Sequence, residues 1–195
     1  MKLWKRIEPT TVQQCGRRTI VSKTFELPGD RIQQFDIKER EGWGGVATVA
    51  LTTEGRALVL RQFRPGVEQI MDELPGGMVE EDEVQETDGA IDIAALTEVA
   101  ARELREETGH TGNMRYLGKL TYDAYTNGWR YAFLATDCLP VEGGQALDAN
   151  EQGAELLEIS VEELIQIALQ GRMTDPGAVL LACAAEGWTL PPLEP

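Results

Sequence analysis

The chain contains little histidine or cysteine. It has one histidine, His110, and three widely separated cysteines, Cys15, Cys138 and Cys183, with no C-x-x-C pair. Structural zinc sites need clustered cysteine and histidine, and disulfide frameworks need an even set of cysteines at regular spacing. The composition therefore argues against both. It fits a reducing compartment, and the cytoplasm is the expected location.

Long apolar runs and an excess of positive charge are also missing. No segment is apolar over the roughly 20 residues that a bilayer requires, and the polar residues after position 6 do not form a signal-peptide core. The chain has 18 Lys and Arg against 33 Asp and Glu, a net charge of −15. Such a chain repels duplex nucleic acid and anionic membranes, so we expect neither as a partner. A small phosphorylated substrate remains compatible if metal ions neutralise the local charge.

The remaining composition is that of an ordinary globular protein. The length of 195 residues and the hydrophobic content of 42% suit one domain, with room for a small second lobe. Alternating apolar residues predict two antiparallel strands within residues 19–38, joined by a turn at 28–30. By the same criterion, further strands are predicted at residues 46–51, 57–63, 116–122, 130–135 and 156–159.

Three segments have the pattern of helices. Residues 93–108 show helical periodicity and end at Gly109, a suitable C-cap. Ser160 and Glu163 form a capping box that starts a helix running to about residue 169. A last helix is predicted at residues 176–185. Antiparallel strands combined with a few helices predict an α/β (α+β) fold with α/β/α layering.

The predicted helix at 93–108 carries a concentrated set of carboxylates. Glu103, Glu106 and Glu107 are spaced i, i+3, i+4 and share one face, where like charges repel. One interpretation is a solvated acidic surface with ion pairs such as Glu98 with Arg102. The other is a site for hard divalent cations such as Mg²⁺ or Mn²⁺, which prefer carboxylate oxygen and keep substrate phosphate in their shell.

The surrounding residues resemble the signature of the Nudix hydrolases, G-x5-E-x7-R-E-U-x-E-E-x-G-U, where U is a bulky apolar residue. Gly77 and Glu83 match its first half, and residues 102–109, R-E-L-R-E-E-T-G, match its second half without a mismatch. The chain departs from the signature in two places. Residues 84–101 are 18 positions where the signature has seven, so we expect an inserted loop around residues 84–93. His110 replaces the final apolar residue.

The resemblance implies a Nudix-like α/β/α sandwich with a mixed sheet. It also implies a metal site in which Glu103, Glu106, Glu107 and the backbone carbonyl of Gly76 bind Mg²⁺ or Mn²⁺. The metal ions would neutralise a diphosphate, position it and activate water.

By the same resemblance, Arg102 belongs to the catalytic set and orients a metal-binding glutamate. Its expected partner is Glu83, with Glu80 or Glu81 as alternatives because of the insertion.

Segments outside the signature resemble the subgroup that cleaves ADP-ribose and related nucleotide sugars. They are R-Q-F-R-P-G at 61–66, E-L-P-G-G at 73–77 and G-R-M-T-D-P at 171–176. Gly76 replaces the subgroup's usual alanine, which we expect to be a mild change. The resemblance implies that Arg64, or alternatively Arg61, binds substrate phosphates and that Glu73 holds the substrate or a metal-bound water. The alternatives are surface cations paired with neighbouring acids and a strand-end acid.

The catalytic base is expected in the loop before the last strand. Glu151 fits the family's acidic loop, and Glu155 is the alternative. Either could instead be a solvated loop acid, because a loop glutamate can reach the reacting water only when substrate and metal are bound.

The N-terminal region is predicted to serve assembly. Enzymes of this subgroup typically form homodimers that exchange N-terminal strands, so we expect a dimerisation region at residues 1–40 and a Nudix hydrolase domain at 41–195. Trp43 and Trp129 either stack on a base or sugar or pack in the core or the dimer interface.

Together these features predict a metal-dependent pyrophosphohydrolase acting on nucleoside diphosphate sugars such as ADP-ribose, with a small-molecule nucleotide as substrate. The subgroup's usual proline after the signature is missing, and Tyr125 lies near its place. This difference keeps open a dinucleoside polyphosphate or dinucleotide coenzyme hydrolase. A non-catalytic nucleotide-sensing Nudix module is the third reading.

Overall fold

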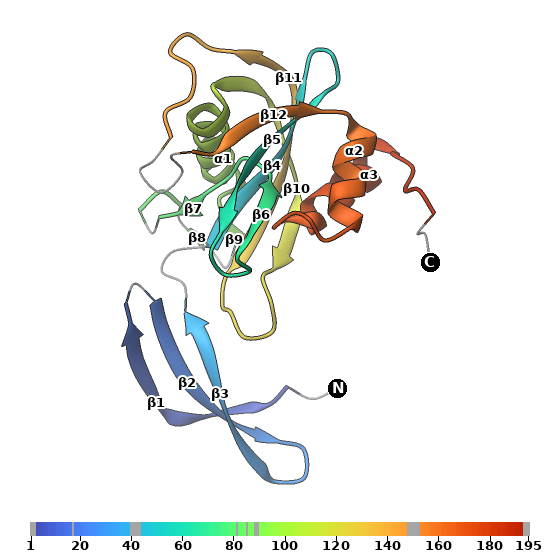
Figure 1. The fold of residues 1–195 in the computed structure, drawn as a ribbon. Coiled ribbons are helices and arrows are strands. Elements are labelled where there is room, and N and C mark those ends of the chain that lie inside the picture. Colours follow the sequence, from blue (N-terminus) through green and yellow to red (C-terminus); the bar gives the residue numbers. More distant parts are fainter. Residues whose placement is uncertain are drawn as a thin grey trace.

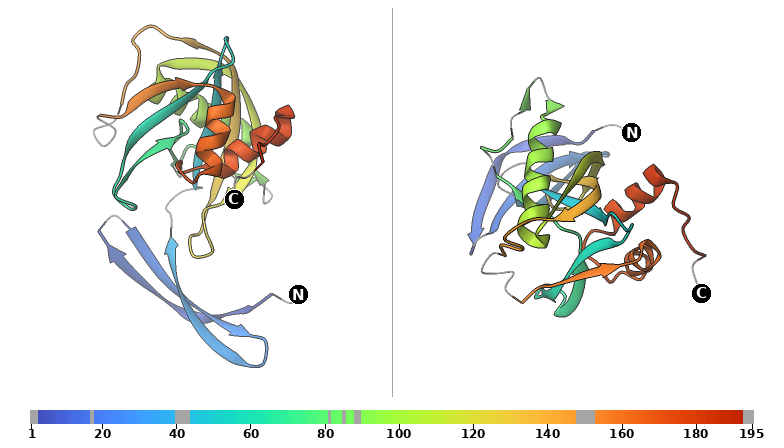
Figure 2. Two further views of the ribbon diagram at one scale, coloured as in Figure 1. Left: turned by 45° about the vertical axis from the view of Figure 1, so that its right-hand side comes forward. Right: turned by 90° about the horizontal axis from the view of Figure 1, so that it is seen from above.

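In a computed structural model of the chain, a mixed β-sheet lies between helices, and a second sheet forms the N-terminal region (Figure 1). The structure describes residues 3–16, 18–39, 44–80, 82–84, 86–87, 90–147 and 153–192. Helix α1 (Ile93–Thr108) covers one face of the mixed sheet, and α2 (Val161–Leu169) and α3 (Pro176–Glu186) cover the other (Figure 2). The predicted α/β/α sandwich with a mixed sheet and an N-terminal antiparallel strand region is confirmed.

The mixed sheet has seven strands, of which five follow the order β10-β11-β4-β5-β12, while β6 pairs with β5 and β7 with β4. Only the β11–β4 pair is parallel. The strands are β4 (Gly44–Thr52), β5 (Ala57–Arg64), β6 (Gln69–Glu73), β7 (Met78–Val79), β10 (His110–Thr121), β11 (Trp129–Pro140) and β12 (Glu155–Ile159).

The core lies on both faces of this sheet. On one face, strand residues such as Val49 and Val59 pack against α2 and α3. On the other, Val46 and Phe133 pack against the apolar stripe of α1, including Leu96. This burial on both faces explains why β4 reads as a nearly continuous apolar run rather than an alternating one.

Helix α1 has the bounds predicted from its periodicity. Asp92 caps its first turn by accepting hydrogen bonds from the backbone N–H of Ala94 and Ala95. Gly109 ends it in the left-handed conformation, at φ 69°, which glycine adopts at little cost. The helix buries Leu96, Val99, Ala100 and Leu104, so its acidic last turn is held in a defined place against the sheet.

Strands β4 and β5 separate after pairing at only two positions, Ala50 with Leu58 and Leu51 with Ala57. The segment 74–79 enters the gap. Backbone N–H groups of β4 donate to this segment, from Thr48 to the Pro75 carbonyl at 2.8 Å and from Val46 to the Gly77 carbonyl at 2.9 Å. The split sheet thus positions residues 75–77 beneath the end of α1.

The predicted insertion is a short two-stranded sheet, β8 (Glu86–Thr87) with β9 (Ala90–Ile91). It joins the domain core through Val84, which is 1% exposed in the cluster around Phe133. Strands β8 and β9 pair with each other and not with the mixed sheet, so the insertion projects from the loop before α1, as expected.

The N-terminal region is an antiparallel sheet of β1 (Lys5–Cys15), β2 (Arg18–Leu27) and β3 (Arg31–Glu39). It lies below the mixed sheet in Figure 1 and meets the β10–β11 loop there. The Lys38 N–H donates to the Tyr125 carbonyl at 2.8 Å, and the Phe35 and Tyr125 rings stack with centroids 6.3 Å apart. The predicted boundary at residues 40–41 lies outside the described residues.

The sequence did not predict every strand. β1 was missed because it is exposed at most positions and lacks apolar alternation. β10 and β11 are longer than predicted, because their polar outer ends continue the ladder. Among the helices of the described residues, none is long and apolar enough to cross a membrane.

Candidate active site

A turn containing Gly76 and Gly77, called here the diglycine turn, lies against the acidic end of α1. The Gly76 N–H donates to Oε2 of Glu107 at 2.7 Å. A Cβ on Gly76 would lie 2.1 Å from the carbonyl oxygen of Val46. Alanine at this position, expected to be a mild change, would therefore overlap the β4 backbone in this chain.

The second glycine of the turn is covered by Glu103. A Cβ on Gly77 would lie 2.4 Å from Cδ of Glu103 and 2.5 Å from each of its carboxylate oxygens. The carboxylate can occupy this place only because Gly77 has no side chain. The turn thus contacts two of the three glutamates predicted to bind metal, Glu103 and Glu107.

Arg102 pairs with three carboxylates: Glu83 at 2.9 Å, Glu103 at 2.9 Å and Glu106 at 3.1 Å. Burial acts to lower the pKa of the Arg102 guanidinium, but the charges of Glu103, Glu83 and Glu106 raise it above the ordinary value. The ion pair between Arg102 and Glu83 is present although the spacing between them is longer than in the signature.

The two alternative partners of Arg102 were Glu80 and Glu81. The backbone N–H of Glu80 donates to Oε2 of Glu83 at 2.9 Å, so it helps to hold Glu83 in place. Glu81 lies outside the described residues.

Arg64 and Glu73 form a bidentate ion pair next to the acidic helix end. The Glu73 side chain is 7% exposed and also accepts a hydrogen bond from Nε2 of Gln62 at 3.1 Å. The hydrogen bond to Glu73 raises the pKa of the Arg64 guanidinium, and the charge of Glu107 adds to this effect. Arg64, Glu73 and Glu107 therefore share one electrostatic environment.

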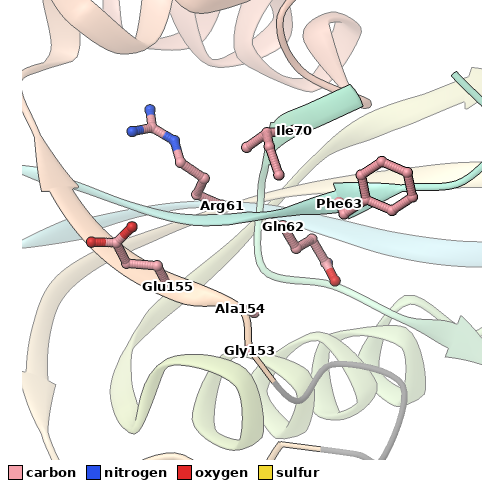
Figure 3. Close-up of a pocket in the computed structure, with 7 residues that line it drawn as sticks. All are labelled: Arg61, Gln62, Phe63, Ile70, Gly153, Ala154 and Glu155. Carbon is pink, nitrogen blue, oxygen red and sulfur yellow. The ribbon is translucent and has the colours of Figure 1, made fainter. Parts of the chain in front are cut away.

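Arg61 and Glu155 lie on the opposite face of the sheet. Side chains alternate between faces along a strand, and the guanidinium of Arg61 binds Asp72 of β6 at 2.7 and 3.0 Å. Glu155 of β12 is opposite Arg61 in register, and both side chains point away from Gln62 (Figure 3). They line a pocket of about 420 Å³ with Ile70. Arg61 and Glu155 therefore do not lie next to the α1 glutamates.

Two other sequence predictions lie outside the described residues: Glu151, the expected base, and Trp43. Trp129 is 38% exposed, and Nζ of Lys119 lies 4.2 Å from the centroid of its ring. Trp129 is thus a surface aromatic side chain with a cation on its face, and the stacking hypothesis for it stays open.

Arg130 was not predicted to belong to the site. Its guanidinium forms a bidentate pair with Asp175 at 2.8 and 2.6 Å and hydrogen-bonds to the Tyr122 hydroxyl. Burial lowers the pKa of Arg130, but Asp175 and Tyr122 raise it above its ordinary value. A cation at the start of an otherwise apolar strand, R-Y-A-F-L-A, was the signal that could have identified it, because buried cations need a partner.

The donor set fits divalent cations in its chemistry. Glu103 and Glu107 contact the backbone of a tight turn, and Glu106 lies one helical position before Glu107. Hard cations prefer such oxygen ligands. The space at Gly77, which any Cβ would fill, allows the Glu103 carboxylate to lie against the turn. In the part of the chain that the structure describes, no three acidic, histidine or cysteine side chains already converge as a metal site. Arg102 binds the carboxylates of Glu103 and Glu106 in this arrangement.

Comparison with known proteins identifies similar chains. The NUDIX domain model matches residues 43–182. The ADP-ribose pyrophosphatase of Bacillus subtilis (strain 168) is 30% identical over 146 residues, which cover 73% of this chain and 70% of that protein. The methanol dehydrogenase activator of Bacillus methanolicus is 26% identical over 157 residues, covering 80% of this chain and 77% of the activator.

Solved structures share the fold. A crystal structure of ADP compounds hydrolase matches with a TM-score of 0.66 and 17% identity, covering 95% of this chain and 100% of that one. A NUDIX hydrolase from Nitrosomonas europaea matches with a TM-score of 0.54 and 19% identity, covering 78% of this chain and 94% of that one. At these identities the likeness shows the architecture alone.

Proposed function

Because this chain belongs to the Nudix family and is a Nudix hydrolase, we propose that it cleaves the diphosphate linkage of nucleoside diphosphate sugars, with ADP-ribose as the first candidate. Nudix hydrolases generally use divalent metal ions. We propose Mg²⁺ or Mn²⁺ here, bound by Glu103, Glu106, Glu107 and the carbonyl of Gly76. The products are a nucleoside monophosphate and a sugar phosphate.

The observation that carries this proposal is the contact between the diglycine turn and the acidic end of α1. Two neighbouring glutamates of α1 differ in exposure. Glu107 is 5% exposed and is held by the Gly76 N–H, whereas the Glu106 side chain is 45% exposed and accessible to solvent. One wall of the site is therefore preorganised and the other is open to a ligand. The ADP-ribose assignment itself is supported by the relative at 30% identity.

The chemistry assigns separate tasks to the chain's own residues. Bound divalent ions would neutralise phosphate oxygens and lower the pKa of water. The α1 glutamates hold these charges in place, and the guanidinium of Arg64 binds the diphosphate through charge-assisted hydrogen bonds. A glutamate base, proposed as Glu151, takes the proton from water as its oxygen bonds to phosphorus and the bridging P–O bond breaks.

A turnover screen tests the proposal. The purified chain is incubated with ADP-ribose, NDP-glucose, NDP-mannose, NADH and diadenosine polyphosphates, with Mg²⁺ or EDTA, and phosphate is measured after phosphatase treatment. We expect the highest kcat/KM with ADP-ribose and no turnover with EDTA. Turnover that persists in EDTA would contradict the metal site. Activity restricted to NADH or diadenosine polyphosphates would replace the nucleotide-sugar assignment by the dinucleotide alternative.

That alternative has one supporting feature, the segment in which Tyr125 stands near the place of the subgroup's proline. Tyr125 is 56% exposed and stacks on Phe35 of the N-terminal sheet. An exposed aromatic face of this kind can bind a second base. The non-catalytic sensor alternative is wrong, because the chain is a Nudix hydrolase.

Arg64 gives the sharpest test of substrate binding. We expect Arg64→Met to raise KM for ADP-ribose by about 10-fold, since a hydrogen bond to a charged group contributes about 1.5–3 kcal/mol. Its side chain is 44% exposed, so substrate can reach it. The matched change is Arg61→Met on the opposite face, which should leave KM within about twofold. It should weaken the fold, because the buried Asp72 would keep only its longer ion pair to Arg172, at 3.8 Å. If Arg61→Met raises KM and Arg64→Met does not, the two roles are reversed.

We also propose that the N-terminal sheet forms a homodimer interface. It carries exposed apolar side chains, with Val12 63% and Ile32 60% exposed, and a surface patch of this kind often serves association. Sedimentation equilibrium decides between one and two copies of the 21.5 kDa chain.

A further inference from the structure

Three polar atoms converge on Gly45, at the start of β4. A Cβ built there would lie 2.7 Å from an Nη atom of Arg130, 2.7 Å from the carbonyl oxygen of Gly77 and 2.7 Å from the Tyr122 hydroxyl. Each pair of these atoms is therefore separated by no more than twice that distance. Gly45 leaves open the space that lets a guanidinium and a hydroxyl approach the carbonyl of the diglycine turn.

Arg130 is held from the other side by the C-terminal part of the chain. Its side chain is 17% exposed and that of its partner Asp175 is 11% exposed. Asp175 is the residue before α3, so the ion pair joins the start of α3 to β11. A largely buried bidentate pair has a defined geometry, and removing one partner costs folding free energy because the other charge is left unpaired.

The segment before Asp175 also holds the strand that leads into the turn. The Asp72 N–H donates to the Arg172 carbonyl at 3.0 Å, and the Thr174 N–H donates to the Asp72 carbonyl at 3.3 Å. Asp72 precedes Glu73, the acidic partner of Arg64. Residues 172–175 thus hold the chain immediately before Glu73 through backbone hydrogen bonds. The same segment holds Arg130 through Asp175, and the Arg130 guanidinium lies near the carbonyl of Gly77.

We propose that Arg130 is a positioning residue that sets the place of the diglycine turn, and through it the position of the Gly76 backbone and of the Glu107 carboxylate that this backbone binds. This inference rests on the metal site proposed above. The side chain of Arg130 binds Asp175 and Tyr122 rather than any of the three α1 glutamates proposed as metal ligands. It acts through the turn, as residues behind a metal ligand commonly do, and loss of such a residue typically costs 10–100-fold in metal affinity or activity.

The test uses the full-length chain with Arg130→Gln. Mn²⁺ is the probe, and its free concentration is followed by electron paramagnetic resonance without substrate. We expect the Mn²⁺ Kd to rise by about 10-fold or more. With ADP-ribose and saturating Mn²⁺, kcat should fall by more than KM rises, because the turn shapes the reacting geometry rather than the initial binding contact. Circular dichroism establishes that the variant is folded.

A matched control separates positioning from general stability. Arg115 on β10 also pairs with an acid of α3, Glu186, at the other end of that helix. Arg115→Gln removes an ion pair that holds α3 to the sheet, at a site away from the diglycine turn. It should leave the Mn²⁺ Kd and kcat unchanged within about twofold, the difference expected for an exposed ion pair.

Arg130→Lys provides a second variant if Arg130→Gln does not fold. Lysine keeps the positive charge but lacks the planar fork that binds Asp175 while facing the Gly77 carbonyl. We expect an intermediate Mn²⁺ Kd for a folded Arg130→Lys.

The possible outcomes separate the two proposals. A folded Arg130 variant with wild-type Mn²⁺ Kd and kcat would overturn the positioning role while leaving the metal site intact. An equal loss of Mn²⁺ affinity in Arg115→Gln would also overturn it, since loosening α3 would then suffice. Failure of the wild-type chain to bind Mn²⁺ or hydrolyse any substrate would instead refute the proposed function.

Discussion

Glu107→Gln is expected to lower kcat by about 1000-fold while the protein stays folded. A loss of this size corresponds to about 4 kcal/mol of transition-state stabilisation, and removing one charge-stabilising group from an active site commonly costs about 100- to 1000-fold. Glu107 is 5% exposed and accepts a hydrogen bond from the diglycine turn, so its carboxylate is held in one place.

The fold should tolerate this change because glutamine has nearly the same shape. Its side-chain oxygen can still accept the hydrogen bond from the Gly76 N–H, which is 2.7 Å long in the wild type. We therefore expect the free energy of unfolding to change by less than about 1 kcal/mol. Only the negative charge is removed, and that charge is what a metal ligand requires.

The measurement is steady-state turnover of ADP-ribose over a Mg²⁺ titration, together with urea unfolding. Glu98→Gln is the matched control, because Glu98 is exposed on the same helix and does not belong to the predicted site. We expect it to retain wild-type kcat. A Glu107→Gln enzyme with more than a tenth of wild-type kcat would show that the acidic face of α1 is not a catalytic metal site.

Gly76→Ala is expected to reduce both stability and activity. The new Cβ would lie 2.1 Å from the Val46 carbonyl oxygen and 2.9 Å from Cα of Ala47. These are backbone atoms of a buried strand and cannot rotate away. Overpacking of this kind costs about 1–3 kcal/mol of folding free energy, and a displacement of about 1 Å in a catalytic group can reduce the rate by about 100-fold.

Urea denaturation and turnover measure the two effects separately. Gly66→Ala in the β5–β6 turn is the control, because a Cβ there would meet no atom within 4 Å. Replacing that glycine should leave turnover intact and leave stability equal or slightly higher, since alanine has fewer conformations in the unfolded chain. Wild-type stability and turnover in Gly76→Ala would mean that β4 can move away from the turn, and the turn would then not be rigidly positioned.

Much of this site was predictable because its residues are close in sequence. The spacing of Glu103, Glu106 and Glu107 places them on one helical face, and α1 has the predicted bounds because its apolar periodicity, its N-cap at Asp92 and Gly109 all agree. Local signals of this kind do not depend on the rest of the fold.

Other features depended on contacts between distant segments. The R-Q-F-R run does not reveal which arginine faces the helix; the register of β5 with β6 decides this by placing Arg61 opposite Asp72. Arg130 and Asp175 are 45 residues apart, and only the packing of α3 on the sheet brings them together. β1 was missed because an exposed strand has no apolar pattern to detect.

The β8–β9 insertion shows which part of the signature tolerates a change of length. The inserted residues begin after Glu83 and end before α1. The Arg102–Glu83 ion pair therefore joins the two sides of the insertion. The entropy of closing a loop grows only slowly with its length, whereas a residue added within 102–109 would rotate the acidic side chains off their common face by about 100°. Engineers could therefore shorten or exchange this hairpin as a cassette, and search profiles for relatives should allow a gap of variable length at this one position.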